Sequence, residues 1–484
     1  MKLNELTVTQ AVQKLESGEI SSYELTKACL ERADQVEGDI NGYTTLLHEA
    51  ALDAAKAVDE KRAKGEKMGK LAGIPGAIKD GISTKGVEST ASSLMLKGYI
   101  PPYNATVIQK LNGEDYVLLG KTNLDEFAMG SSTENSYMGV TKNPWDLTRV
   151  SGGSSGGSAA VVAADEAMFS LGSDTGGSIR QPAAYCGVVG LKPTYGSVSR
   201  YGLFAFASSL DQIGPITKSV EDAALIMNVI SGRDHRDSTS AVMEYPDYQR
   251  DLQKDIKGMK VGVPKEYFEA GMCDDTKKVF QNALDTLAQL GAVVEETTLP
   301  TFDYSLSAYY IISSAEVASN LSRYDGIRYG YRAENVNGIK DLFKKTRSEG
   351  FGAEAKRRIA LGNYVLSSGY YDAYYLKALK VRTLIKRDFE KLFETYDILF
   401  SPVTASPAFA IGEKTSPLDM YATDIFTVPV NIAGLCAISL PGGLSSEGLP
   451  IGVQVIGKAF SECTVLNAAY QLEQALGFAC KPSL

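Results

Sequence analysis

The stretch at residues 151–183 places the tightest constraint on how this chain can fold. It reads SGGSSGGSAAVVAADEAMFSLGSDTGGSIRQPA, in which two loops of glycine and serine flank a segment rich in alanine and valine. The small apolar side chains predict a buried helix, followed by a strand at 168–171. Because apolar runs adjoin the second loop, we expect that loop to be a strand-to-helix turn inside a folded core.

Loops rich in glycine and serine have three common uses. Phosphate binding is the first, but the first loop lacks the G-x-G-x-x-G order, and the GKT sequence at 120–122 has Asp115 where a P-loop needs its first glycine. A flexible linker is the second, and the adjoining apolar runs argue against it. The third is a nucleophile loop, in which glycines let backbone N–H groups converge on an oxyanion beside a serine hydroxyl.

The chain has only two histidines, so few groups are available to activate a serine. His48 lies in a segment that predicts a helix, and His235 lies in a charged turn at 232–237. Neither position is typical of a catalytic base, and we expect both side chains to be structural or exposed. A zinc site built from clustered histidine and cysteine is equally unsupported. Proton transfer in a hydrolytic reaction must then use a group other than imidazole.

A lysine can act as the base only if it loses its proton near neutral pH. Its ordinary pKa of about 10.4 prevents this in water, but burial lowers the pKa. Lys79 follows the apolar run GIPGAI at 73–78, where burial is expected. The alternative is a lysine that reaches to solvent from the end of its strand. These residues by themselves leave both interpretations open.

Short apolar runs alternate with helical segments along most of the chain. The predicted strands are 74–78, 116–119, 168–171, 260–263, 292–295, 398–400 and 451–456. The predicted helices include 46–64, 220–230, 275–290 and 462–476. Because many of these strands are apolar throughout, we predict the α/β class, with a mixed β-sheet covered by helices on both faces.

We expect one large domain over 1–484. Residues 1–66 are predicted to form an N-terminal helical region, in which Ser21 or Ser22 and Glu24 make a capping box. The α/β core is expected over 67–303 and 388–484, with a helical insertion at 304–387 near the active site. The insertion contains the run SSGYYDAYY, whose tyrosines are either core filler or part of a lid over a polar site.

Charge and cysteine usage restrict the partners and the compartment. The net charge of −9, from 49 basic and 58 acidic residues, argues against a chain that wraps nucleic acid on its own surface. The six cysteines include no CxxC pair, which indicates reduced thiols. We find no apolar segment typical of a signal peptide or a membrane span, and we expect a cytoplasmic protein.

The order of these motifs resembles that of the amidase signature family. Lys79 after its apolar run, GGSSGG at 152–157 and DTGGSIRQPA at 174–183 match the motifs of that family, in which a Ser–cis-Ser–Lys triad replaces Ser–His–Asp. The resemblance implies that Ser178 is the nucleophile, that Ser154 is the bridging serine after a cis peptide bond, and that Lys79 is the base. It also implies the amidase-signature fold. The oxyanion donors that it implies are the backbone N–H groups of Thr175, Gly176 and Gly177.

Longer stretches are similar to the branch of this family that works in tRNA-dependent amidotransferases. These stretches are 120–136, 208–215, 366–375 and 417–424. In that branch the amide is glutamine, and its ammonia passes to a partner subunit that activates the carboxylate of Glu-tRNA(Gln) or Asp-tRNA(Asn). The resemblance implies B and C subunits as partners in a heterotrimer, with misacylated tRNA bound through the partner. It implies no cofactor in this chain, because ATP and Mg are used by the partner subunit.

A glutamine site needs a cation for the α-carboxylate and an anion for the α-ammonium. The resemblance assigns these roles to Arg358 and Asp424, with a hydroxyl from Tyr309. The alternatives are a helix-surface charge, a helix cap and a core aromatic, respectively. A stand-alone amidase acting on another small amide would keep the triad without needing the charged pair. A scaffold without activity is disfavoured because all three triad positions are intact.

Overall fold

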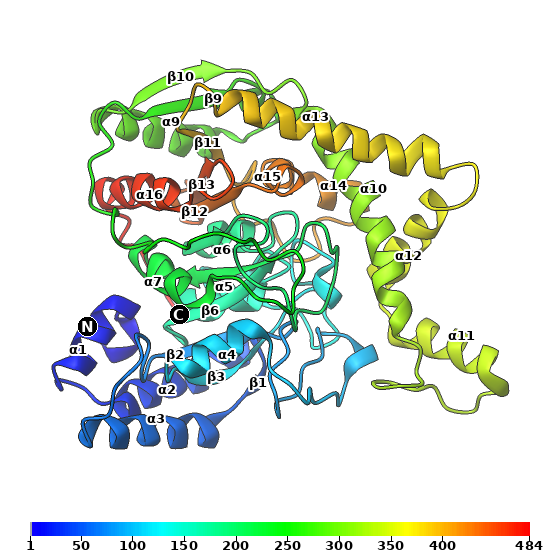
Figure 1. Ribbon diagram of the computed structural model, residues 1–484, viewed down its shortest axis with the longest axis horizontal. Coiled ribbons are helices and arrows are strands. Elements are labelled where there is room, and N and C mark those ends of the chain that lie inside the picture. Colours follow the sequence, from blue (N-terminus) through cyan, green and yellow to red (C-terminus); the bar gives the residue numbers. More distant parts are fainter. Residues whose placement is uncertain (1) are drawn as a thin grey trace.

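The computed structural model describes residues 2–484, within which eleven strands form one large sheet with helices packed against it (Figure 1). The strand order is β1-β3-β2-β6-β8-β7-β12-β13-β11-β9-β10. In that order the strands span Tyr43–Leu46, Val117–Thr122, Pro75–Lys79, Phe169–Asp174, Gln212–Thr217, Val189–Lys192, Cys436–Leu444, Pro450–Gly457, Ile398–Pro402, Lys260–Pro264 and Val293–Thr297. A separate two-stranded sheet pairs β4 (Lys142–Asn143) with β5 (Asp146–Val150). The α/β prediction with a mixed sheet is confirmed.

The sheet is parallel near its two ends and antiparallel in the middle. Parallel pairs join β3 to β2, β2 to β6, β11 to β9 and β9 to β10. Antiparallel pairs run from β6 through β8, β7, β12 and β13 to β11. All seven strands predicted from apolar runs are present, within three residues at each end. The missed strands, such as β8 with its sequence QIGPIT, contain glycine, proline or polar residues that weaken the apolar pattern.

The helices cover the sheet and connect its strands. They are α1 (Val8–Glu16), α2 (Ser22–Ile40), α3 (His48–Ala63), α4 (Thr106–Gly113), α5 (Gly156–Ala163), α6 (Arg180–Cys186), α7 (Val220–Ile230), α8 (Glu266–Glu269), α9 (Asp274–Gln289), α10 (Phe302–Asn320), α11 (Gly338–Gly350), α12 (Ala353–Val365), α13 (Lys377–Leu392), α14 (Pro417–Ala422), α15 (Val428–Ala433) and α16 (Glu462–Leu476). The predicted capping box is confirmed, because Ser21 Oγ accepts the Glu24 N–H while the Glu24 carboxylate accepts the Ser21 N–H. Within residues 2–484, no helix is long and apolar enough to cross a membrane.

The first 66 residues are not entirely helical, although their composition predicted helices throughout. Residues Tyr43–Leu46 form β1, which pairs antiparallel with β3 at one edge of the main sheet. The α3 helix therefore begins at His48 and not at Leu46. The apolar spacing misplaced this boundary because a short edge strand leaves few residues on which a period can be read.

The insertion forms an arm of helices at one end of the molecule (Figure 1). It contains α10, α11, α12 and α13, with a non-helical segment at 324–337 between α10 and α11. Tyr370, Tyr371 and Tyr374 are 40–41% exposed, so they do not fill a core. Tyr309 and Tyr310, in contrast, are buried on α10, which packs against α12, α13 and α15.

Two neighbouring parallel strands bring the glycine-serine loops to one place. β2 ends at Lys79, and β6 beside it ends at Asp174, where the second loop begins. The carboxyl ends of parallel strands lie at the same edge of a sheet, where α/β proteins commonly place their sites. The first loop reaches the same edge because it precedes α5, which packs on β2 and β6. The buried segment at 151–183 is thus the centre of the site.

We predict that Gly76→Ala lowers the free energy of unfolding by about 1–3 kcal/mol, because a well-packed core tolerates added volume poorly. A Cβ on Gly76 would lie 2.4 Å from the ring of Phe169, which is paired with it on β6. Urea denaturation followed by circular dichroism measures the change. Gly81→Ala is the matched control, because its Cβ would meet nothing closer than a Leu124 methyl group at 3.6 Å. Equal losses in the two variants would contradict the prediction.

Candidate active site

Lys79 is completely buried at the end of β2, beside the two glycine-serine loops. Its Nζ donates hydrogen bonds to the hydroxyl oxygens of Ser154 (2.7 Å), Ser155 (2.7 Å) and Ser173 (3.0 Å). All three acceptors are uncharged, and none of the ion pairs within residues 2–484 includes Lys79. The side chain therefore does not reach to solvent. Ser155 and Ser173 were not singled out from the sequence, although both lie inside the motifs.

Burial lowers the pKa of Lys79 to about 7, against the opposing charges of Asp125, Asp174 and Asp211. A buried ammonium loses its hydration, and hydroxyl dipoles replace only part of it. Near neutral pH a substantial fraction of this amine is therefore unprotonated. Lys79 can accept a proton under conditions in which an ordinary lysine cannot.

Ser154 and Ser178 lie on two loops that touch each other beside Lys79. The peptide bond between Gly153 and Ser154 is cis, as the resemblance implies. The Ser155 N–H donates to the carbonyl oxygen of Ser178 at 3.1 Å. Ser154 is completely buried, whereas Ser178 is 8% exposed. The structure thus joins Lys79 directly to Ser154, while no hydrogen bond within residues 2–484 joins the hydroxyls of Ser154 and Ser178.

The carboxylate of Asp174 holds the second loop in its turn. It accepts the N–H groups of Gly177 (2.8 Å) and Ile179 (3.2 Å) and forms a fully buried ion pair with Arg180 (3.0 Å). Burial would raise the pKa of Asp174, but the charge and hydrogen bonds of Arg180 outweigh this effect and hold the pKa at about 2. Asp174 is therefore ionised at neutral pH, and its charge orders the backbone around Ser178.

The backbone at 175–177 differs in one respect from the expected oxyanion site. The Gly177 N–H already donates to Asp174, and an amide has only one proton, so this group is not free in the structure. A Cβ on Gly176 would lie 2.6 Å from the ring of Tyr309, and a Cβ on Gly177 would lie 2.2 Å from Thr427 Oγ1. Both positions require glycine because these side chains close over the turn.

Asp125 supports the first loop, a role that the sequence motifs did not indicate. Its carboxylate accepts the N–H groups of Thr133 (2.9 Å) and Ser132 (3.3 Å). Its own N–H donates to the Ser154 carbonyl at 3.3 Å. Burial raises the pKa of Asp125 to about 6. The signal for this residue was its place in the stretch at 120–136 that carries the resemblance.

Arg358, expected at the substrate site, is buried and not a helix-surface charge. It lies on α12 and is 3% exposed. Its Nε donates to Glu354 at 2.6 Å, whereas its Nη1 is buried without a hydrogen-bond partner within residues 2–484. A buried donor without a partner is costly, and this makes it a candidate to receive a ligand oxygen. Both Arg358 and Glu354 line a pocket of about 230 Å³.

Asp424 lies in the same polar cluster and is 7% exposed. Its carboxylate accepts the hydroxyl protons of Ser131 (2.8 Å) and Tyr310 (3.0 Å). Its side chain makes no capping hydrogen bond to α15, which the cap interpretation required. Burial raises the pKa of Asp424 to about 7, although these two hydrogen bonds and Arg358 oppose the shift. A cationic group bound beside it would keep the carboxylate ionised.

Tyr309 connects the nucleophile turn to this cluster. Its ring contacts Gly176 and meets the ring of Tyr310 edge to face, with centroids 5.0 Å apart. The structure therefore brings Tyr309, Arg358 and Asp424 to one region beside Ser178. Tyr310, Glu354 and Ser131 belong to the same region and were not predicted.

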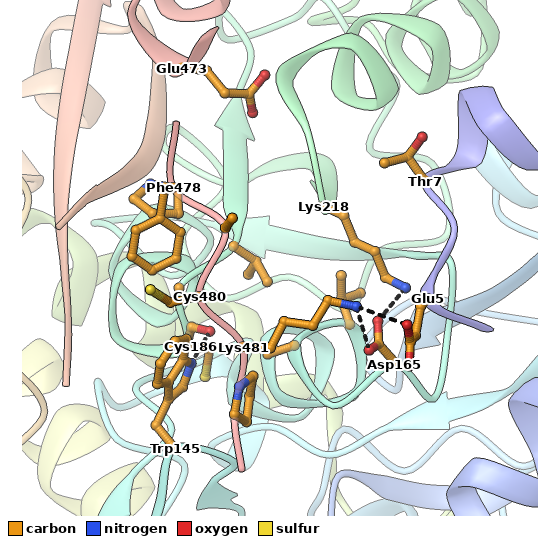
Figure 2. A pocket seen from close by; sticks show the side chains of 17 residues that line it. Glu5, Thr7, Trp145, Asp165, Cys186, Lys218, Glu473, Phe478, Cys480 and Lys481 are labelled. Atoms are coloured by element: carbon orange, nitrogen blue, oxygen red, sulfur yellow. Dashed lines mark hydrogen bonds and ion pairs between the residues drawn. The ribbon is translucent and has the colours of Figure 1, made fainter. Parts of the chain in front are cut away.

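A second pocket of about 210 Å³ lies where the C-terminal tail crosses the N-terminal region (Figure 2). Figure 2 shows Lys218 and Lys481 directed at Asp165, and both form ion pairs with it. Trp145 Nε1 donates to the Cys186 carbonyl on another wall. None of the residues predicted for the active site lines this pocket, and its lysines are already paired with acids.

The two histidines lie on the surface, as expected. His48 pairs with Asp34 at 2.8 Å and is 43% exposed, and His235 is 90% exposed. Within residues 2–484, no group of histidine, cysteine, aspartate and glutamate is arranged to hold a metal ion. The site consists of a lysine, serines and ion-pairing side chains.

Comparison with known proteins agrees with this geometry. The family model described as Amidase matches residues 24–466. The A subunit of glutamyl-tRNA(Gln) amidotransferase from Carboxydothermus hydrogenoformans is 58% identical over 99% of both chains. The protein of the same name from Caldanaerobacter subterraneus subsp. tengcongensis is 59% identical over 100% of this chain and 99% of its own. A crystal structure of the corresponding protein from Thermotoga maritima is 42% identical, with a TM-score of 0.82 over 98% of this chain and 95% of that one.

We predict that Asp174→Asn lowers the free energy of unfolding at pH 7 by about 3–5 kcal/mol, because it leaves Arg180 buried without its charged partner. The pKa of Asp174 is about 2 in the folded protein and 3.8 ordinarily, so its ionisation stabilises the fold above pH 3.8. The difference between wild type and variant should therefore shrink as the pH falls from 3.8 to about 2.

Urea denaturation at several pH values measures this difference. Asp372→Asn is the control, because that side chain is exposed on the insertion. A variant as stable as the wild type at pH 7, or a difference that does not change in acid, would contradict the role given to Asp174.

Proposed function

This chain belongs to the amidase family, and from that premise we propose that it hydrolyses glutamine to supply ammonia to a tRNA-dependent amidotransferase. The observation that carries the proposal is the buried pair of charged side chains beside the nucleophile turn. Arg358 has a free buried donor for an α-carboxylate, and Asp424 offers an anion for an α-ammonium. A small amide without these two groups would leave both charges unpaired, so the pair favours glutamine over the stand-alone amidase alternative.

The triad transfers the proton that the reaction must move. Neutral Lys79 accepts the proton of Ser154, and Ser154 accepts that of Ser178. The Ser178 oxygen then bonds to the amide carbon and a tetrahedral oxyanion forms. The short contact between Lys79 and Ser154 supports this relay, and the exposure of Ser178 suits the residue that must meet the substrate.

Backbone N–H groups of Thr175 and Gly176 stabilise the oxyanion in this proposal. Gly177 contributes only if substrate binding frees its N–H from Asp174. The carbon–nitrogen bond then breaks, and the relayed proton leaves with the nitrogen as ammonia. Water hydrolyses the remaining ester on Ser178, which releases glutamate and restores the serine.

The ammonia needs an acceptor that this chain does not offer. We propose that B and C subunits complete the enzyme as partners and that one of them activates the carboxylate of misacylated tRNA with ATP and Mg. The names of the relatives support this assignment. The net charge of −9 supports placing the tRNA on a partner.

Glutamine hydrolysis by the Ser178→Ala variant tests the proposal directly. Ammonia release should fall to a trace, because the variant lacks the nucleophile, while the fold should survive the loss of one hydroxyl. The wild-type chain is assayed alone and with candidate partner subunits and misacylated tRNA. Ser368→Ala, on the exposed surface of the insertion, is the control and should keep full activity. A folded Ser178→Ala variant that retains more than a trace of activity would exclude this serine as the nucleophile.

We predict that kcat for glutamine rises with pH through a midpoint near 7. Burial lowers the pKa of Lys79 to about 7, and only the unprotonated amine can accept the serine proton. Saturating glutamine removes the contribution of Asp424, whose pKa is also raised to about 7, because the bound ammonium keeps that carboxylate ionised. The midpoint should survive His48→Ala and His235→Ala. Loss of the limb in either histidine variant would show that the base had been misassigned.

A further inference from the structure

We propose that Glu354 is a positioning residue that fixes the guanidinium of Arg358 for the α-carboxylate of the substrate. The inference rests on the proposed function, and it concerns a side chain that touches neither the triad nor the scissile amide. Glu354 and Arg358 stand four residues apart on α12, so one turn of helix places them side by side.

The two oxygens of Glu354 are committed to different partners. Oε1 accepts both Arg358 Nε (2.6 Å) and the Tyr421 hydroxyl (2.8 Å), and Oε2 is paired with Arg357. Burial would raise the pKa of Glu354, but the charge of Arg358 and its hydrogen bond outweigh this and hold the pKa below its ordinary value. Glu354 is therefore an anion at neutral pH, and its position is held from α12 and from α14.

Aromatic rings restrict the same guanidinium from its flat sides. Arg358 Cζ lies 4.5 Å from the ring centroid of Tyr310 and 4.6 Å from that of Tyr421. The two rings are stacked, with centroids 4.0 Å apart. Tyr310 also donates its hydroxyl proton to Asp424, so this ring links the cationic and anionic halves of the pocket. Such cation–π contacts add attraction without satisfying any N–H donor.

One buried donor of Arg358 is left after these contacts. With Nε held by Glu354, the orientation of the guanidinium plane is set, and Nη1 stays buried without a partner within residues 2–484. A charge-assisted hydrogen bond from that atom to a carboxylate oxygen would satisfy it. A donor held in place before binding loses little freedom when the substrate arrives, and this favours affinity.

Glu354 also has an opposite effect, which makes the inference testable. Its negative charge reduces the attraction between Arg358 and any second carboxylate. If charge dominated, removing that charge would tighten substrate binding; if positioning dominates, removing the hydrogen-bond acceptor weakens it. Glu354→Gln removes the charge but keeps an oxygen that can accept the Arg358 Nε–H, whereas Glu354→Ala removes both. The two variants therefore separate the effects.

The experiment measures glutamine hydrolysis by the 484-residue chain and its variants with the partner subunits present. We expect Glu354→Ala to raise KM for glutamine roughly tenfold with kcat changed less than about threefold, since the ordered contact of Arg358 is lost before the chemical step. Glu354→Gln should recover most of the affinity. Arg358→Ala should raise KM at least as much. Lys356→Ala, an exposed position on the same helix, is the matched control and should match the wild type.

The probe for specificity is 4-aminobutanamide, which keeps the amide and the ammonium of glutamine but lacks the carboxylate. Its kcat/KM should be the same in the wild type and in Glu354→Ala. An unchanged or lower KM for glutamine in Glu354→Ala, or equal losses for both substrates, would overturn the positioning role. Failure of the Ser178→Ala chain to bind glutamine in titration calorimetry would instead overturn the proposed function, and this inference with it.

Discussion

The burial of one amine among hydroxyl groups is the constraint on which the rest of this site depends. Lys79 has serine oxygens as its nearest acceptors and no carboxylate in ion-pair contact within residues 2–484. An adjacent carboxylate would hold the proton on the amine, whereas burial among neutral dipoles drives it off. Asp125 and Asp174 lie in the same region, but backbone N–H groups occupy both, and Arg180 neutralises the second. Their charge thus orders the loops and only weakly opposes the shift at Lys79.

Two kinds of charge therefore act differently in one buried region. The pair of Asp174 and Arg180 is permanent, and it gives a glycine-rich turn a single conformation. Arg358 and Asp424 are incompletely satisfied, the first by a donor without a partner among residues 2–484 and the second by a pKa raised to about 7. Unsatisfied buried charge is expected where a ligand completes the structure. The sheet edge holds the reactive serine, and the helical insertion holds the recognition groups.

Sequence patterns found the strands and helices whose apolar period is long enough to read, such as α7 and α16. They missed β1, because four residues at a sheet edge show no clear period. They found Lys79, Ser154 and Ser178 because these residues stand in ordered motifs with restricted composition. They did not find Tyr310, Glu354 or Asp125, because a tyrosine or a carboxylate has many ordinary uses and only its neighbours in space distinguish them.

By itself the sequence determined the α/β class, the buried glycine-serine segment and the absence of a plausible histidine base. Those features depend on local composition and spacing, which a linear chain displays in full. Only the tertiary structure decided that Lys79 is buried, that the Gly177 N–H is taken by Asp174, and that a donor of Arg358 has no partner within residues 2–484. Burial and hydrogen-bond satisfaction depend on atoms far apart in the chain. No spacing rule reports them, because it is the packing of β2, β6, α12 and α14 that brings those atoms together.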